Sequence, residues 1–439
     1  MVPTITATIR WRVELTAFLH IFLPHTFRAE KDEGDDDGHS SQQCLDCPPM
    51  KNTPTDPVPL LQDLIRCKSV TPDEGGALSL LENLLSGHGF TCHRLMFKDE
   101  GTPGVDNLFA RFGSGAPHFC FAGHTDVVPE GHAEGWSHAP FAADIADGFI
   151  FGRGATDMKG SVAAFAGAAV DFLKTAGKFK GSISFLITGD EEGPAINGTV
   201  KVLQWMREHG HVPDHCLVGE PSCVDTLGDT IKIGRRGSLS FVMSVEGRQG
   251  HAAYPHKADN PVPKLARFID RISFAKLDDG NAHFDPSTLA VTTFDVGNPA
   301  GNVIPSRASA KFNIRFSPVH DFETLRAWVD AHIAAVKAEL GGTWSYVTIE
   351  GAHSFLTAPG PFVGLVQDAV ERETGILPKL STSGGTSDAR FVKDFCPVLE
   401  FGPTNATIHQ TDERISIDEL RATQAIYGSI LDAYFNSQP

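Results

Sequence analysis

Short apolar segments alternate with helix-length amphipathic segments from about residue 75 to residue 235 of this sequence. Segments 119–122, 182–188 and 216–218 have the length and the nearly continuous apolar composition of buried strands. Residues 160–175 lie between the first two and show helical spacing, with apolar side chains on one face at Val162, Phe165, Ala166, Ala169, Val170 and Leu173. Strands that alternate with helices indicate an α/β fold, with a mixed, mostly parallel sheet flanked by helices.

Residues 237–351 show a different order of predicted elements. The order is strand, helix, strand, strand, helix, strand, at 239–247, 261–274, 287–296, 308–316, 321–340 and 344–350. This order is typical of a ferredoxin-like split βαβ unit. We therefore predict that residues 237–351 form a separate α+β domain inserted into the first one.

The α/β pattern returns after the predicted insertion. A helix is expected near 362–373, a strand at 398–401, and a last helix that begins at Ser416, with Glu419 completing a capping box. The sequence thus predicts one catalytic domain built from residues 55–236 and 352–439.

The first 54 residues differ in composition from the rest of the chain. They contain an acidic run from Glu30 to Asp37, followed by a polar stretch that ends at Pro48 and Pro49, so we expect residues 1–54 to be a disordered N-terminal extension. Cys44 and Cys47 form a single Cys-x-x-Cys in this extension. No second pair accompanies them, which argues against a metal or redox role.

Charge and cysteine usage exclude several classes of function. The formal net charge of −17 argues against a nucleic-acid or anionic membrane surface, because either would require a basic face. The eight cysteines are scattered and several lie in apolar runs, as expected for reduced thiols. No apolar run approaches the ~20 residues needed to span a membrane. We therefore expect a cytoplasmic protein that binds neither nucleic acid nor membrane.

Four predicted strands lead into side chains that can bind metal. In chain order, these side chains are His124, the pair Glu191 and Glu192, Glu220 and, after a loop, His409. A further candidate, Asp157, lies in a glycine-flanked segment just before the helix at 160–175. Since ligands of open α/β sheets bind at the carboxyl ends of the strands, we expect these side chains to converge.

Two histidines with three carboxylates form a ligand set that suits zinc or cobalt. Five ligands suit two ions ~3.5–4 Å apart that share one carboxylate. Glu191 and Glu192 point in opposite directions in an extended segment, so one is expected to bind metal and the other to take a proton from a metal-bound water. Asp126 is expected to accept the N–H of the His124 imidazole and to fix its tautomer. Each motif alone is more often structural, and their conjunction at four strand ends is what predicts a metallohydrolase.

At these residues the chain resembles the M20 family of metallopeptidases and deacylases. That family carries His-x-Asp, an aspartate before Met-Lys-Gly, paired glutamates, a later acidic ligand and a C-terminal histidine, all present here in that order between about residues 58 and 436. The resemblance implies a zinc-peptidase-like catalytic domain with two Zn²⁺ per subunit, which Co²⁺ can replace. It assigns the bridging ligand to Asp157, one site to His124 and Glu220, the other site to Glu192 and His409, and the base to Glu191.

More specific segments resemble the family members that hydrolyse N-succinyl-L,L-2,6-diaminopimelate to succinate and L,L-2,6-diaminopimelate, in lysine and diaminopimelate biosynthesis. These segments are 234–238, 250–256, 302–305, 312–315 and 383–391. They imply that an anionic small-molecule substrate is bound by Arg235, Asn302, Arg315, Gly385 and Thr386.

The resemblance also implies a homodimer through the inserted domain. In it, His251 of one subunit reaches the active site of the other and stabilises the oxyanion. Two alternatives stay open: another M20 amidohydrolase, such as an acetylornithine deacetylase or an aminoacylase, and a non-catalytic metal-binding protein.

Overall fold

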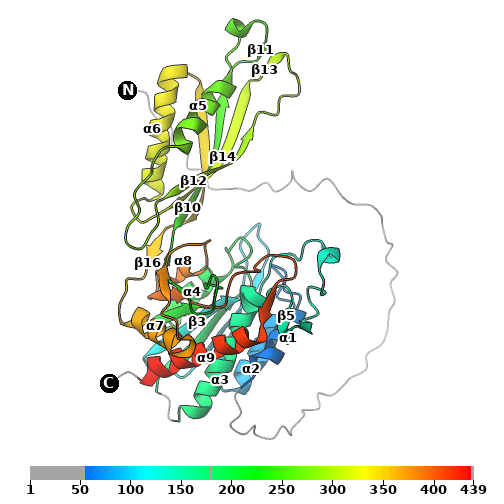
Figure 1. The fold of residues 1–439 in the computed structure, drawn as a ribbon, viewed down its shortest axis with the longest axis vertical. Helices are drawn as coiled ribbons and strands as arrows, with labels where there is room; N and C mark the ends of the chain where they lie inside the picture. Colours follow the sequence, from blue (N-terminus) through cyan, green and yellow to red (C-terminus); the bar gives the residue numbers. More distant parts are fainter. Residues whose placement is uncertain (1–54, 178–179, 437–439) are drawn as a thin grey trace, which may run out of the picture. The chain divides into compact units, whose positions relative to one another are not determined.

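The structure is a computed structural model that describes residues 55–177 and 180–436 (Figure 1). The expectations for residues 1–54, including the disorder of this extension and the pair Cys44 and Cys47, lie outside the described residues. Within the described ranges, no helix combines the length and the apolar composition that crossing a membrane requires.

A mixed sheet of eight strands forms the centre of the α/β part, in the order β1-β2-β6-β3-β7-β18-β8-β17. Its four middle strands run parallel to one another and are β6 (Ser182–Thr188), β3 (His118–His124), β7 (His215–Val218) and β18 (Val398–Glu400). The outer strands are β1 (Thr91–Phe97), β2 (Val105–Phe112), β8 (Thr230–Lys232) and β17 (Lys379–Ser381). Every residue of β3 and β6 is buried, as expected for strands covered on both faces.

Helices cover both faces of this sheet. Those that share one hydrophobic cluster with it are α1 (Pro57–Arg66), α2 (Ala77–Gly87), α3 (Gly160–Thr175), α7 (Pro361–Thr374) and α9 (Ile417–Asn436). A second cluster joins the sheet to α4 (Thr199–Glu208) and α8 (Ala389–Val392). The predicted α/β class is therefore confirmed, and the parallel middle strands direct their carboxyl ends to one edge.

The second sheet has four antiparallel strands in the order β12-β14-β10-β15. Its strands are β10 (Gly237–Glu246), β12 (Thr288–Asp295), β14 (Arg307–Phe316) and β15 (Thr343–Ala352), and its helices are α5 (Pro261–Ser273) and α6 (Phe322–Leu340). The chain order and the strand order are those of a ferredoxin-like fold, as predicted. These elements have a hydrophobic cluster of their own, so we propose that residues 237–351 are a domain.

Several short strands complete the described chain. A three-stranded sheet contains β4 (Ile145–Ala146), β5 (Phe149–Phe151) and β19 (Arg414–Ser416), and two-stranded pairs join β9 (Gly234–Arg235) to β16 (Phe355–Leu356) and β11 (Gly250–His251) to β13 (Val303–Ile304). Helix α9 begins one residue after Ser416, whose Oγ accepts the N–H of Glu419 at 2.9 Å. The Glu419 carboxylate accepts the N–H of Thr404 at 2.7 Å, so only the serine half of the predicted capping box forms.

Candidate metal centre

The metal-type side chains gather at the carboxyl edge of the four parallel strands. His124 is the last residue of β3, and Glu220 follows β7 by two residues. Glu191 and Glu192 follow β6 after Gly189 and Asp190. The fold thus gathers residues from segments that are far apart in the sequence, because adjacent parallel strands end at the same edge.

Asp157 lies between the two histidines. Its Oδ1 is 3.1 Å from His124 Nε2, and its Oδ2 is 3.4 Å from His409 Nε2. His124 and Asp157 are buried, whereas the His409 side chain is 47% exposed. Each carboxylate oxygen therefore faces a different imidazole, which is the arrangement required of a carboxylate that bridges two ions.

The remaining carboxylates surround this centre. Glu192 Oε1 is 2.8 Å from His409 Nε2, and Glu220 Oε1 is 3.8 Å from His124 Nε2. Ligand atoms lie within 4.8 Å of one another in two groups, one of His124, Asp157 and Glu192 and one of His124, Glu191 and Glu220. These side chains form a candidate metal site, and Glu191 lies within reach of a metal as well as Glu192.

The electrostatics of the cluster fit a cation. Burial raises the pKa of Glu220 well above its ordinary value, and Asp157 and Glu191 raise it further. Burial likewise raises the pKa of Glu191 well above its ordinary value, although His124 opposes the shift. Carboxylates so close together in a buried site repel one another unless positive charge is present. Divalent ions coordinated by imidazole and carboxylate would supply that charge.

Asp126 makes contacts that the sequence did not indicate. The N–H partner of the His124 ring is the Asp126 backbone carbonyl, 2.8 Å from Nδ1, while the Asp126 carboxylate is 3.6 Å away. That carboxylate accepts the backbone N–H groups of Glu191 at 3.3 Å and Glu192 at 3.0 Å. Asp126 therefore holds both the imidazole and the turn that carries the paired glutamates.

Glu413 is a buried residue at the site that the sequence did not reveal. Its carboxylate accepts hydrogen bonds from the backbone N–H groups of Gly154, Thr156 and Asp157 and from the Arg153 guanidinium. The sequence shows only that Arg153 stands between two glycines, whereas its burial, which requires a carboxylate partner, is known from the fold alone.

Arg235 is engaged in a buried ion pair. Its Nε lies 2.9 Å from both carboxylate oxygens of Glu400, Nη2 also bonds Glu400, and Nη1 donates to the Ser383 carbonyl at 3.1 Å. Gly385 and Thr386 follow in the same loop as Ser383. Glu400 thus already balances the charge of Arg235, which a substrate carboxylate was expected to do.

The three other expected site residues lie on the inserted segment. His251 is exposed on the β11–β13 ribbon, where its Nδ1 accepts the Ala253 N–H at 3.0 Å, and the Asn302 carbonyl accepts the Ala252 N–H at 2.8 Å. Arg315 lies on β14, where burial and the neighbouring Arg236 lower its pKa. These hydrogen bonds join residues of the inserted segment to one another, and Arg236 lies directly before this segment.

Comparisons with known sequences give consistent relatives. Residues 120–433 match the family described as Peptidase family M20/M25/M40. A protein of Parvibaculum lavamentivorans named succinyl-diaminopimelate desuccinylase is 54% identical over 383 residues, covering 87% of this chain and 96% of its own length. A Rhodospirillum centenum protein of the same name is 54% identical over 380 residues, covering 87% of this chain and 97% of its own length.

Solved structures share the fold at much lower identity. An aminopeptidase from Bacillus cereus has a TM-score of 0.71 at 20% identity, covering 86% of this chain and 98% of its own. Human carnosine dipeptidase 1 has a TM-score of 0.66 at 18% identity, and the match covers 87% of this chain and 96% of the dipeptidase chain. A Bacillus subtilis protein described as a dinuclear metal binding peptidase has a TM-score of 0.64 at 14% identity, and the match covers 87% of this chain and 98% of the Bacillus chain.

Proposed function

Because the chain belongs to peptidase family M20/M25/M40, we propose that it hydrolyses the amide bond of N-succinyl-diaminopimelate, releasing succinate and diaminopimelate. The observation that carries this proposal is the 54% identity, over 87% of the chain, to relatives named for that reaction. The reaction belongs to lysine and diaminopimelate biosynthesis, and a cytoplasmic location is part of this proposal. The free cysteines of the described chain, such as the buried Cys120 and Cys216, fit a reducing compartment.

Asp157 is the ligand shared by two ions in this proposal. His124 and Glu220 complete one site, and Glu192 and His409 complete the other. The distances from the two Asp157 oxygens to the two imidazoles support this division. When bound, zinc or cobalt would lower the pKa of a coordinated water and polarise the amide carbonyl.

Glu191 is the base that takes the proton of the attacking water and returns it to the leaving amine. The different surroundings of the paired glutamates support this role, because Glu192 contacts His409 whereas Glu191 lies beside His124 and Glu220. The Asp126 carboxylate fixes the backbone of both glutamates, so a proton acceptor at Glu191 would keep its position during turnover.

Arg235, Asn302, Arg315, Gly385 and Thr386 bind the substrate in this proposal. Arg315 is suited to a carboxylate because its planar fork binds both oxygens and because Arg236 adds positive charge nearby. Arg235, balanced by Glu400, acts by holding the Ser383 to Thr386 loop through its bond to the Ser383 carbonyl.

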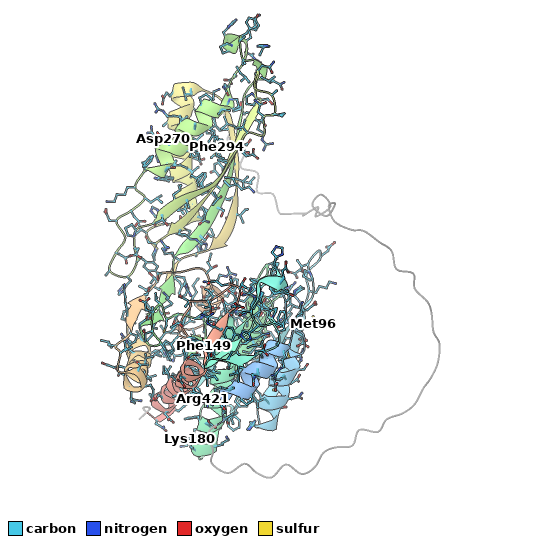
Figure 2. The ribbon with its side chains drawn as sticks, turned by 45° about the vertical axis from the view of Figure 1, so that its right-hand side comes forward. Met96, Phe149, Lys180, Asp270, Phe294 and Arg421 are labelled. Atoms are coloured by element: carbon cyan, nitrogen blue, oxygen red, sulfur yellow. The ribbon has the colours of Figure 1, made fainter. Side chains whose placement is uncertain are left out.

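A second copy of this chain is the proposed partner. Two exposed apolar side chains, Val347 and Ile349, lie on one face of the outer strand β15 and are 53% and 56% exposed. Phe294, 44% exposed, lies on the outer strand at the opposite edge of the sheet (Figure 2 labels Phe294). The pair on β15 favours association of that edge with a second copy. In the proposed dimer, His251 acts on the substrate bound by the other subunit, where it donates a hydrogen bond to the oxyanion.

A comparison of two substrates tests the proposed activity. Succinate release from N-succinyl-diaminopimelate is measured beside acetate release from N-acetylornithine, with the same zinc-loaded protein. We expect a kcat/KM for the succinylated substrate that is larger by orders of magnitude. Preference for the acetylated substrate would identify a different M20 amidohydrolase. Hydrolysis of neither substrate would favour the alternative of a non-catalytic metal-binding protein.

A further inference from the structure

The backbone that carries Asp157 is irregular. It lies in the segment Ala155–Lys159, where Asp157 has φ −117° and ψ 97° and Met158 has φ −129° and ψ 28°, and Gly154 before it has φ 83°. A segment of this shape cannot satisfy its N–H groups through regular helical hydrogen bonds. The position of the Asp157 carboxylate therefore depends on what holds these N–H groups.

One buried carboxylate holds them. Glu413 Oε1 accepts the N–H groups of Thr156 at 3.0 Å and Asp157 at 3.1 Å, and Oε2 accepts the N–H of Gly154 at 3.0 Å. Glu413 is fully buried and lies only four residues after His409 in the chain. The segment that supplies one imidazole thus also fixes the backbone of the aspartate between the two imidazoles.

Arg153 connects the same two segments a second time. Its Nη1 donates to Glu413 Oε2 at 2.8 Å and to the Gln410 carbonyl at 3.2 Å, and its guanidinium lies 5.1 Å from the centre of the Trp136 ring. Arg153 is only 3% exposed. The bond to Gln410 restrains the residue directly after His409.

Stability alone does not account for this pair, because a buried ion pair contributes little net free energy compared with apolar residues of the same volume. All of the hydrogen bonds just described go to the segments that carry Asp157 and His409. We propose that Glu413 and Arg153 are positioning residues, which hold the bridging aspartate and His409 at the separation that binds a pair of divalent ions.

This inference rests on the proposed metal binding but not on the proposed substrate. Partners that orient metal ligands typically change metal affinity by about 10- to 100-fold when they are removed. We expect Glu413→Gln to weaken zinc binding by about this factor, because an amide offers one acceptor oxygen and turns an N–H₂ group toward backbone donors.

The test measures zinc affinity directly, by competition with a chromophoric chelator, and records the visible absorption of the cobalt-loaded protein. Glu413→Gln is compared with Asp229→Asn as a matched control. Asp229 likewise closes a loop by accepting the N–H groups of Val224, Asp225 and Thr226, and none of these donors belongs to the segment of Asp157 or to that of His409. Arg153→Lys is a second variant that keeps the charge but loses the fork between Glu413 and Gln410, and it carries the test where Glu413→Gln does not fold.

The melting temperature of each metal-free variant separates positioning from simple stability. The inference is supported if Glu413→Gln or Arg153→Lys weakens zinc binding and alters the cobalt spectrum, while Asp229→Asn leaves both unchanged at an equal or larger loss of melting temperature. It is overturned if the folded variants bind zinc like the unmodified protein, or if Asp229→Asn weakens binding as much. Lack of desuccinylase activity in the unmodified protein would affect only the proposed substrate.

Discussion

At the scale of single residues, the paired glutamates give the sharpest prediction. We expect Glu191→Gln to retain both ions but to lower kcat by about 10²- to 10⁴-fold, because only the proton acceptor is removed. We expect Glu192→Gln to lose metal, since Glu192 contacts His409. Elemental analysis and steady-state kinetics of both variants check this, and an exchange of the two behaviours would reverse the assignment of base and ligand.

The sequence indicated which residue types meet at the site, but not all of their contacts. His124, Glu192 and Glu220 could be named because each follows a predicted strand, and parallel strands end at one edge. The use of the Asp126 carbonyl, and of Glu413 beneath Asp157, could not be predicted. Neither strand pattern nor motif spacing says which distant backbone N–H a carboxylate will accept.

Among the helices and strands, the longer ones formed where their apolar periodicity predicted them. Residues 160–175 and 182–188 form α3 and β6 with the predicted bounds, because their apolar periodicity agrees with their burial. The strands β9 and β16 have two residues each and were not predicted. A strand of that length has no periodicity, and it forms only where the rest of the fold supplies a neighbouring backbone.

Acid is expected to destabilise the folded chain through His118, the first residue of β3. His118 is buried at this position, its Nε2 is 2.7 Å from Ser184 Oγ on β6, and burial, reinforced by Arg111, lowers its pKa to about 4. The unfolded chain binds a proton at this histidine below its ordinary pKa of ~6.5, whereas the folded chain does so only near 4. Stability is therefore lost as the pH falls from about 6.5 to about 4.

Urea unfolding of metal-free protein across this pH range measures the effect. The free energy of unfolding should fall more steeply in the unmodified protein than in His118→Gln, by up to about 3 kcal/mol over the whole interval. Using metal-free protein for both keeps the contribution of His124 and His409 the same. Parallel pH profiles of the two proteins would show that His118 is not buried in its neutral form.

At the scale of the whole molecule, the proposed dimer predicts complementation between inactive subunits. His251→Ala should lower kcat strongly and leave the metal content intact, because His251 is exposed and remote in sequence from the metal-type residues. Mixing it with Glu191→Gln should restore part of the activity, since some mixed dimers pair an intact base with an intact histidine. Full activity of His251→Ala, or no recovery after verified subunit exchange, would argue against action across the dimer.

In the proposed enzyme, the cluster around Asp157 holds the two ions with which the chain cleaves its amide substrate. The most direct measurement is succinate release from N-succinyl-diaminopimelate by protein stripped with a chelator, while zinc is added back in known equivalents. We expect no release from stripped protein, recovery as zinc is added, and saturation at two equivalents per chain. Full succinate release from protein that elemental analysis shows to be free of metal would contradict it.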